Sequence, residues 1–269
     1  MWYGAIGLVV AGLLGYALWE PYRLKVTQHR VVIPDLADEF DGFTILQLSD
    51  IHGRVGVFSW RVFLGWLAQA DLVAVTGDLY SPTLPRARLA RQLSQLHAPS
   101  GVFFVSGNHD YRRGALHIEP WGVGEELLDN RVARIERKGG RLLIAGIPDL
   151  VKGSPQWADL LHTLRGTPGP AILLSHRPDA WLLEGIERVS LILSGHTHGG
   201  QVRIPGLGAL FRHNHLPSRY VAGRLDRPGH PVLITSQGLG TSEMPVRFLT
   251  RPEVIVVRLG TGRAATVRS

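Results

Sequence analysis

Five short polar motifs between residues 50 and 198 carry the side chains that could do chemistry in this chain. They supply carboxylates, imidazoles and one amide, which bind divalent cations through oxygen and nitrogen. In chain order the motifs are Asp50-Ile51-His52, Gly77-Asp78, Gly107-Asn108-His109-Asp110, Ser175-His176 and Gly195-His196-Thr197-His198. The chain has no cysteine, so thiolate coordination is excluded. The donor set suits two divalent ions in one site, a pair that can activate a bridging hydroxide and polarise a phosphoryl oxygen.

Each motif directly follows an apolar run that is predicted to be a buried strand. The runs are Thr44–Leu48, Leu72–Thr76, Val102–Ser106, Ala171–Leu174 and Leu191–Leu193. In an extended segment, side chains two residues apart point the same way, so Asp50 with His52, and His196 with His198, should each aim at one place. Glycines at positions 77, 107 and 195 allow tight turns beside the site. The alternative is a scatter of polar residues satisfied by ordinary hydrogen bonds.

Taken together and in this order, the motifs resemble the calcineurin-like metallophosphoesterase family, with similarity expected from about Val31 to Leu259. The resemblance implies a four-layer α/β/β/α sandwich of two mixed sheets and a dinuclear metal site. The implied ligands are Asp50, His52 and His198 for one ion, Asn108, His176 and His196 for the other, and Asp78 for both. It also implies that His109 contacts the phosphate or protonates the leaving group, and that Asp110 orients His109. Ser81 stands where many members carry Asp, but that position is not one of these ligands.

The ligand types favour manganese, with iron, zinc or magnesium as alternatives. Magnesium fits least well, because imidazole is not its preferred ligand. The identity of the two divalent ions does not follow from the sequence.

The first 19 residues carry no charged side chain, which is the second strong signal in the sequence. As a helix, 18 residues would span about 27 Å, close to the roughly 30 Å of bilayer hydrocarbon. Aromatic residues lie toward both ends, and Glu20-Pro21 ends the helix. Residues 1–20 are therefore predicted to be a transmembrane anchor. A cleaved signal peptide, which would lack its basic n-region here, and a buried core helix are the alternatives.

Basic residues follow this segment at Arg23, Lys25 and Arg30. The positive-inside rule then predicts a single-pass protein of the inner (cytoplasmic) membrane with its catalytic domain on the cytoplasmic side. Gly7, Ala11 and Gly15 recur every four residues, a spacing typical of helix–helix contact. A homodimer through the transmembrane helix is one partner expectation that follows.

The remaining residues are predicted to form a tether and first strand over 21–42 and one α/β domain over 43–269. An apolar content of 45% supports a full core, and 19% charged residues argue against disorder. Further strands are expected at Arg141–Gly146, Pro231–Gln237 and Val254–Leu259, and a strand or a tether at Lys25–Ile33. Helices are expected at Ser59–Ala70, Arg86–Leu96 and Asp179–Glu184.

The net charge of +7 has three readings: binding to nucleic acid, binding to an anionic membrane surface, or a solvated basic surface with no partner. Nucleic acid is not the expected partner, because no dense basic run is interleaved with aromatics. An anionic membrane surface explains the same charge. The segment Ile204–Tyr220 mixes leucines with arginines and follows the last motif closely, so it should lie near the metals. It could receive an acyl chain and a phosphate, or it could simply pack on the core.

The apolar N-terminus followed by Glu20-Pro21-Tyr22-Arg23 resembles the membrane-anchored bacterial branch of the family. That branch is similar to enzymes that hydrolyse UDP-2,3-diacylglucosamine, a lipid A precursor. The resulting hypothesis is a membrane-anchored, dinuclear metal-dependent phosphoester or pyrophosphate hydrolase acting on a lipid-linked nucleotide. A phosphodiesterase for soluble nucleotides or nucleic acid, and a catalytically silent metal-binding scaffold, are the alternatives.

Overall fold

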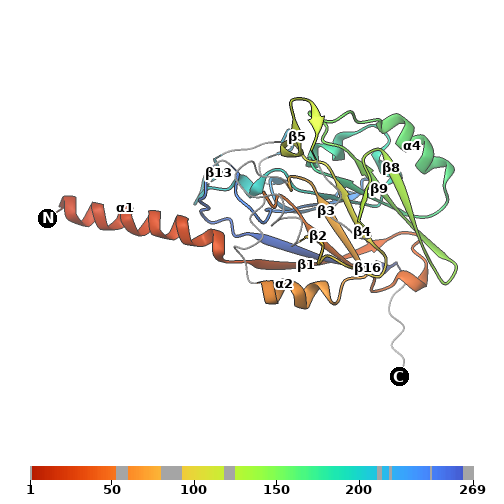
Figure 1. Cartoon of the computed structure of the whole chain (residues 1–269), viewed down its shortest axis with the longest axis horizontal. Helices are drawn as coiled ribbons and strands as arrows, with labels where there is room; N and C mark the ends of the chain where they lie inside the picture. Colours follow the sequence, from red (N-terminus) through yellow and green to blue (C-terminus); the bar gives the residue numbers. More distant parts are fainter. Residues whose placement is uncertain are drawn as a thin grey trace, which may run out of the picture.

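The computed structural model describes residues 2–52, 60–79, 93–117, 125–210, 214–217, 220–242 and 244–262. Two six-stranded sheets lie face to face, with helices on their outer sides (Figure 1). The helices are α1 (Trp2–Trp19), α2 (Trp60–Leu67) and α4 (Trp157–Gly166), and the 3-10 helices are η1 (Glu20–Tyr22), η2 (Asp38–Phe40), η3 (Asn108–Asp110), η4 (Pro178–Leu182), η5 (Ile186–Arg188) and η6 (His198–Gly200).

The first sheet has the strand order β1-β16-β2-β3-β4-β7. Its strands are β1 (Lys25–Ile33), β16 (Glu253–Thr261), β2 (Thr44–Leu48), β3 (Leu72–Thr76), β4 (Val102–Val105) and β7 (Glu125–Leu127). The strands from β2 to β7 run parallel, while β16 is antiparallel to β2 and parallel to β1. The segment Lys25–Ile33 is thus a strand, paired with β16 along all of its nine residues.

The second sheet has the order β14-β15-β11-β10-β9-β8. It contains β14 (Gly223–Leu225), β15 (Val232–Thr235), β11 (Leu191–Ser194), β10 (Ala171–Ser175), β9 (Gly140–Ile147) and β8 (Arg131–Arg137). The four central strands are parallel, and the two edge strands are antiparallel to their neighbours. Two small hairpins complete the described strands: β5 (Tyr111–Arg112) with β6 (Ala115–Leu116), and β12 (Arg203–Ile204) with β13 (Gly208–Ala209).

Alternation along the strands produces three apolar layers. Ile45 of the first sheet and Ile172 of the second belong to the core between the sheets. Their strand neighbours Leu46 and Leu173 face the other way, toward α2 and α4 respectively. The four-layer α/β/β/α arrangement predicted from the sequence is confirmed, because each sheet buries one face on the other sheet and one face under helices.

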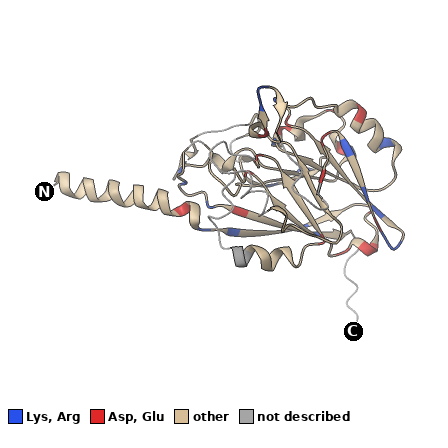
Figure 2. Cartoon of the chain, in the orientation of Figure 1, with Lys and Arg blue, Asp and Glu red and all other residues tan. Residues whose placement is uncertain are grey.

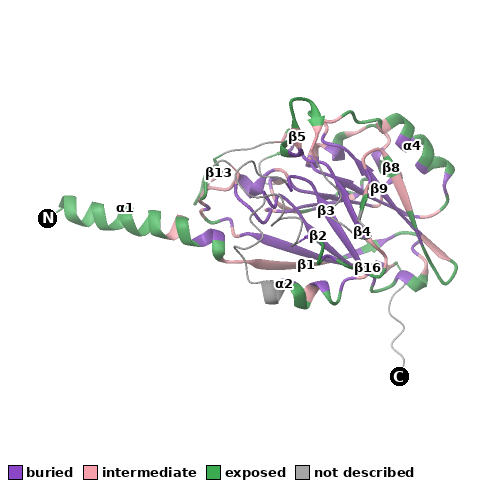
Figure 3. Cartoon of the chain, in the orientation of Figure 1, coloured by how far each residue is buried: buried purple, intermediate pink, exposed green. Residues whose placement is uncertain are grey.

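Helix α1 projects away from the domain and carries no charge before Glu20 (Figures 1 and 2). Within its described residues 2–19 no side chain is buried, as Figure 3 shows. The core-helix alternative is therefore wrong. By length and composition, this is one helix that could cross a membrane.

The other predicted helices have mixed outcomes. Helix α2 occupies most of the predicted range Ser59–Ala70. The short helix predicted at Asp179–Glu184 is present as the 3-10 helix η4, with its bounds shifted to Pro178–Leu182. Most of Arg86–Leu96 lies outside the described residues, as does Ser81.

Candidate metal centre

The parallel strands bring the five motifs to one edge of the sandwich. Asp50 and His52 follow β2, Asp78 follows β3, and Asn108 and His109 follow β4 in the first sheet. From the second sheet, His176 follows β10, and His196 and His198 follow β11. Parallel strands place their carboxyl ends together, so loops from both sheets meet at one place.

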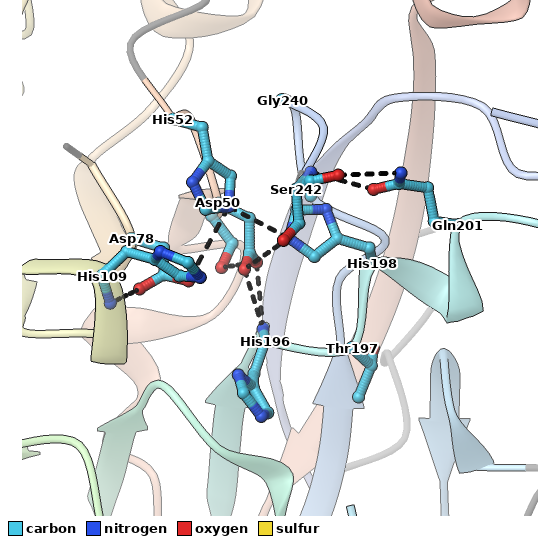
Figure 4. A network of polar contacts seen from close by, with 12 residues as sticks. Asp50, His52, Asp78, His109, His196, Thr197, His198, Gln201, Gly240 and Ser242 are labelled. Atoms are coloured by element: carbon cyan, nitrogen blue, oxygen red, sulfur yellow. Dashed lines mark hydrogen bonds and ion pairs between the residues drawn. The ribbon is translucent and has the colours of Figure 1, made fainter. Parts of the chain in front are cut away.

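Four of the predicted ligands form a first group of converging donor atoms: Asp50, His52, Asp78 and His198. The Nε2 atoms of His52 and His198 lie 3.1 Å apart. Asp50 Oδ1 is 3.4 Å from His198 Nε2, and Asp78 Oδ2 is 3.7 Å from His52 Nε2. Figure 4 shows these side chains pointing toward one another. All four residues are buried.

A second group adjoins the first and contains Asp78, His176 and His196. His176 Nε2 lies 3.3 Å from Asp78 Oδ2, 3.2 Å from His196 Nδ1 and 3.1 Å from Asn108 Oδ1. The same Asp78 oxygen thus faces both groups. The structure brings all seven predicted ligand side chains together, in the division that the family resemblance implied.

This donor arrangement fits divalent cations. Donors that each lie about 2.1 Å from one ion are about 3 Å from one another, which is the spacing seen within both groups. The Nε2 atoms of His52 and His198 face each other at 3.1 Å, where one neutral ring can donate to the other or both lone pairs can be directed at one cation. A carboxylate oxygen directed at both groups is suited to bridge two positive charges.

The protonation states of the buried groups also favour the binding of divalent cations. Burial lowers the pKa of His52 to about 4 and holds that of His198 well below its usual range, so both rings are neutral at pH 7. Burial also acts to lower the pKa of His176, but Asp78 and then Asp50 outweigh it and raise that pKa to about 10. Without an ion, a proton on His176 supplies positive charge to the carboxylates, and a cation can take its place.

Many of the predicted ligands also share an unusual backbone conformation, a positive φ angle. Eleven non-glycine residues in the described part of the chain have positive φ, and five of them are predicted ligands. These five are Asp50, His52, Asp78, His196 and His198, with φ between 46° and 70°. The expectation that Asp50 with His52, and His196 with His198, lie in extended segments is therefore wrong. The side chains converge through left-handed turns, which cost about 1–2 kcal/mol per residue and are concentrated at functional sites.

The three predicted glycines are required by close packing. A Cβ at Gly77, where φ is +87°, would lie 2.6 Å from His176 Nδ1. At Gly107 a Cβ would overlap the Asp78 carboxylate, and at Gly195 it would overlap the Ser49 hydroxyl. Each position brings backbone against a site side chain, so an alanine there would displace a donor atom.

His109 and Asp110 hold different positions around the site. The His109 side chain is exposed, with its ring centroid 5.0 Å from that of His52, and its backbone N–H donates to Asp78 Oδ1 over 2.8 Å. The buried Asp110 carboxylate accepts backbone N–H bonds from Gly107, Asp78 and Leu79 at 2.8–2.9 Å. Asp110 thus fixes the two loops that carry Asp78 and His109.

Several residues around the site were missed from the sequence. Arg177 Nε donates to the buried Asp149 carboxylate over 2.7 Å, and Arg177 Nη1 lies 2.7 Å from His196 Nε2. Fully buried Arg247 donates to the backbone carbonyls of Gly238 and Gly240, which pack against the Asp50 segment. The position of Arg177 directly after His176 was the available signal for it, whereas Arg247 has none in the sequence.

A cavity of about 410 Å³ opens over both groups. Site residues including Asp78, Asn108 and His109 line one part of it, and Arg177 adds a cation. The opposite wall comes from later segments of the chain and includes Gln201, Val202, Ser242 and Met244. The volume is typical of small-molecule sites, and the lining combines anion-binding and apolar groups.

Comparison with known proteins identifies the class. Residues 43–200 match the model of the calcineurin-like phosphoesterase family, and the chain belongs to that family. The phosphoester hydrolase activity and a metallophosphoesterase site with a candidate pair of ions follow from this membership and the Asp/His cluster.

Individual relatives match most of this chain. The metallophosphoesterase YkuE of Bacillus subtilis is 31% identical, over 95% of each chain. The phosphodiesterase YaeI of Escherichia coli is 30% identical, over 89% of this chain and 90% of its own. A transmembrane protein with a metallophosphoesterase domain from Danio rerio is 31% identical, over 86% of this chain and 56% of its own.

Among solved structures, the NAD nucleotidase NadN of Haemophilus influenzae shares the fold. Its TM-score is 0.52 at 15% identity, over 73% of this chain and 50% of its own. At that identity the likeness concerns the fold alone.

Proposed function

We propose that this chain is a membrane-anchored, dinuclear metal-dependent hydrolase of phosphodiester or pyrophosphate bonds, acting on a lipid-linked nucleotide such as UDP-2,3-diacylglucosamine. The observation that carries the metal-dependent chemistry is the single Asp78 oxygen that faces two groups of nitrogen and oxygen donors. Asp50, His52 and His198 would hold one ion, and Asn108, His176 and His196 the other. Manganese suits this donor set, with iron, zinc and magnesium as alternatives.

When bound, the two ions would polarise phosphoryl oxygens and make water nucleophilic at neutral pH. The chain's own residues would do the rest. Arg177, held by Asp149, places positive charge in the cavity where a phosphate or pyrophosphate would lie. His109, exposed at the cavity wall beside His52, would give a proton to the leaving oxygen.

The lipid-linked substrate class rests on how α1 joins the cavity wall. The carbonyl of Ala17, in the last turn of α1, accepts the Arg247 backbone N–H over 3.0 Å. The Tyr16 ring lies 5.4 Å from the Phe248 ring. The same segment carries Ser242 and Met244 at the cavity, so a helix that crosses the membrane would hold the cavity beside the bilayer surface.

A substrate panel tests this proposal with detergent-solubilised full-length enzyme and Mn²⁺. We expect metal-dependent hydrolysis of bis(p-nitrophenyl) phosphate, and a kcat/KM at least tenfold higher for UDP-2,3-diacylglucosamine than for UDP-N-acetylglucosamine. Asp78→Asn serves as the background control. Equal rates on the acylated and unacylated nucleotides would contradict the lipid substrate and favour soluble nucleotides. No metal-dependent hydrolysis of any compound would contradict the catalytic proposal and favour a silent metal-binding scaffold.

A further inference from the structure

Exposed apolar side chains lie on segments next to the residues that line the cavity. In the β12–β13 hairpin, Leu207 is 79% exposed and Leu210, just after it, is 50% exposed. Across from the hairpin, Met244 is 54% exposed and Leu249 is 46% exposed. Single exposed leucines are common, but a group of them beside a binding cavity is typical of an interaction surface. These four residues are called the apolar rim below.

Backbone bonds join the apolar rim into one piece. The Arg203 N–H donates to the Phe248 carbonyl over 2.9 Å, and the Phe248 N–H donates to the Gln201 carbonyl over 3.0 Å. The Gln201 side chain in turn donates to the carbonyls of Ser242 and Met244. The hairpin is therefore bonded to the strand-like segment at Phe248, and the residues that adjoin these two segments, Val202 and Met244, line the cavity.

This piece is attached to the end of α1. Phe248 packs on Tyr16, and the neighbouring Arg247 N–H binds the Ala17 carbonyl. Figure 1 shows β13 on the side of the domain from which α1 projects. The apolar rim thus lies on the side of the domain where the chain would leave a membrane.

Residues at the end of α1 indicate the level of the bilayer surface. Trp19 and Tyr22 are more than half exposed, and the Arg23 guanidinium lies 4.5 Å from the Trp19 ring centroid. Exposed aromatic side chains next to a basic residue are typical of the membrane–water interface. Phe248 contacts Tyr16 in the last turn of α1, and the rim residue Leu249 follows Phe248 directly, so the rim begins close to this aromatic group.

We propose that the apolar rim lies in the interface of the membrane that α1 crosses, so that the cavity opens onto the lipid headgroup layer. This inference rests on the proposed membrane anchoring and adds a second contact with the bilayer. Leucine and methionine side chains would enter the boundary between headgroups and acyl chains. A lipid-linked phosphate could then reach the metal centre without leaving the bilayer.

Site-directed fluorescence tests this contact, because the chain has no cysteine of its own. An environment-sensitive NBD label is attached to Leu207→Cys in the full chain, reconstituted into liposomes with and without nitroxide-labelled acyl chains. Val32→Cys is the matched control: it is also an exposed apolar position (52%), but it lies near the far end of β1, about 23 Å along the strand from Lys25. Leu13→Cys, within α1, reports whether the anchor is inserted.

We expect the labels at positions 207 and 13 to shift to the blue and to be quenched by nitroxide lipids, while the label at position 32 is not quenched. Leu210→Cys should repeat the result for position 207. A label at 13 that is quenched, with labels at 207 and 210 that behave like the one at 32, would overturn this inference and leave the anchor intact. An unquenched label at 13 would overturn both the membrane anchoring by α1 and the membrane contact of the apolar rim. Quenching at 32 equal to that at 207 would show nonspecific contact and would overturn the inference about the rim.

Discussion

Left-handed backbone conformation is concentrated at the ligand residues, which make up five of the eleven described non-glycine residues with positive φ. Five of the seven predicted ligands adopt left-handed conformations, which are uncommon for non-glycine residues, although aspartate and histidine tolerate them better than most. Hydrogen bonds hold these turns. The Asp50 N–H donates to the Gly77 carbonyl and the His52 N–H to the Asp78 carbonyl, each over 3.0 Å. The fold therefore keeps the donors converged in a conformation that costs backbone energy.

The first residue-scale prediction concerns His109. We expect His109→Ala to lower kcat about 100-fold, because an exposed ring beside the site would no longer donate a proton to the leaving oxygen. The metal content should stay that of the wild type, since the His109 side chain is not among the converging donors. Elemental analysis and steady-state rates on an aryl phosphodiester check both statements. A variant with unchanged metal content and an unchanged rate would show that His109 has no such part.

The second residue-scale prediction concerns pH. In the metal-free protein the folded-state pKa of His176 is about 10, above the ordinary value of 6.5. Its contribution to stability is therefore fully present below pH 6.5 and is lost as the pH rises through 10. Between pH 7.5 and 9.5, the stability advantage of wild type over His176→Asn should fall by about 1.4 kcal/mol per pH unit.

Urea unfolding of EDTA-treated wild type and His176→Asn measures this difference. Pairing the two metal-free proteins cancels the other groups that titrate in the same range. A stability difference that stays constant between pH 7.5 and 9.5 would contradict a protonated His176.

At the scale of elements, sequence pattern was informative wherever a strand was apolar on both faces. Thr44–Leu48 and Leu72–Thr76 were predicted with their observed bounds, because both faces of a central parallel strand are covered. The edge strand β8 was missed, since its sequence from Arg131 to Arg137 alternates arginine and glutamate with apolar residues and it has only one buried residue. Its strand character comes from pairing with β9, which local sequence does not reveal.

The site likewise has features that local sequence reveals and features that depend on contacts between separate segments. The seven donors were recognisable as residue types at the ends of strands, so their convergence could be predicted from the parallel arrangement alone. Their left-handed turns could not, because the turns depend on cross-strand bonds such as those to the carbonyls of Gly77 and Asp78. The sequence places Arg177 next to His176 but does not reveal its contact with Asp149, 28 residues away. It gives no signal for Arg247, whose burial depends on the tertiary packing of the 238–250 segment.

An element-scale prediction tests the core between the sheets. Leu142 of β9 is fully buried there, so Leu142→Ala should reduce the free energy of unfolding by about 3 kcal/mol through lost burial and the cavity left behind. Leu182→Ala is the matched control: this side chain is 56% exposed, and its loss should cost under about 0.5 kcal/mol. Denaturant unfolding followed by tryptophan fluorescence measures both. Equal destabilisation of the two variants would contradict the layer assignment.

At the scale of the whole molecule, the apolar helix and the catalytic domain form one connected unit. The buried Glu20 side chain accepts a hydrogen bond from Tyr16, and the Arg251 guanidinium donates to the Arg23 carbonyl. The cavity wall and the end of α1 share the segment around Phe248. Such a connection gives the proposed anchor a fixed orientation relative to the active site, which a flexible tether would not provide.

The whole-molecule prediction concerns membrane orientation. Arg23, Lys25 and Arg30 follow α1 closely. We therefore expect a C-terminal green fluorescent protein fusion to fluoresce in the membrane fraction of a bacterial host, and a C-terminal alkaline phosphatase fusion to be inactive. An active phosphatase fusion would place the domain on the other side of the membrane. Fluorescence found only in the soluble fraction would contradict the anchor itself.

The central statement, that two ions share the carboxylate of Asp78, is tested most directly by anomalous diffraction from crystals of the full chain grown with Mn²⁺. We predict two anomalous peaks, one among Asp50, His52 and His198 and the other among Asn108, His176 and His196, with Asp78 in contact with both. A single peak, no peak, or two peaks of which only one touches Asp78 would contradict it.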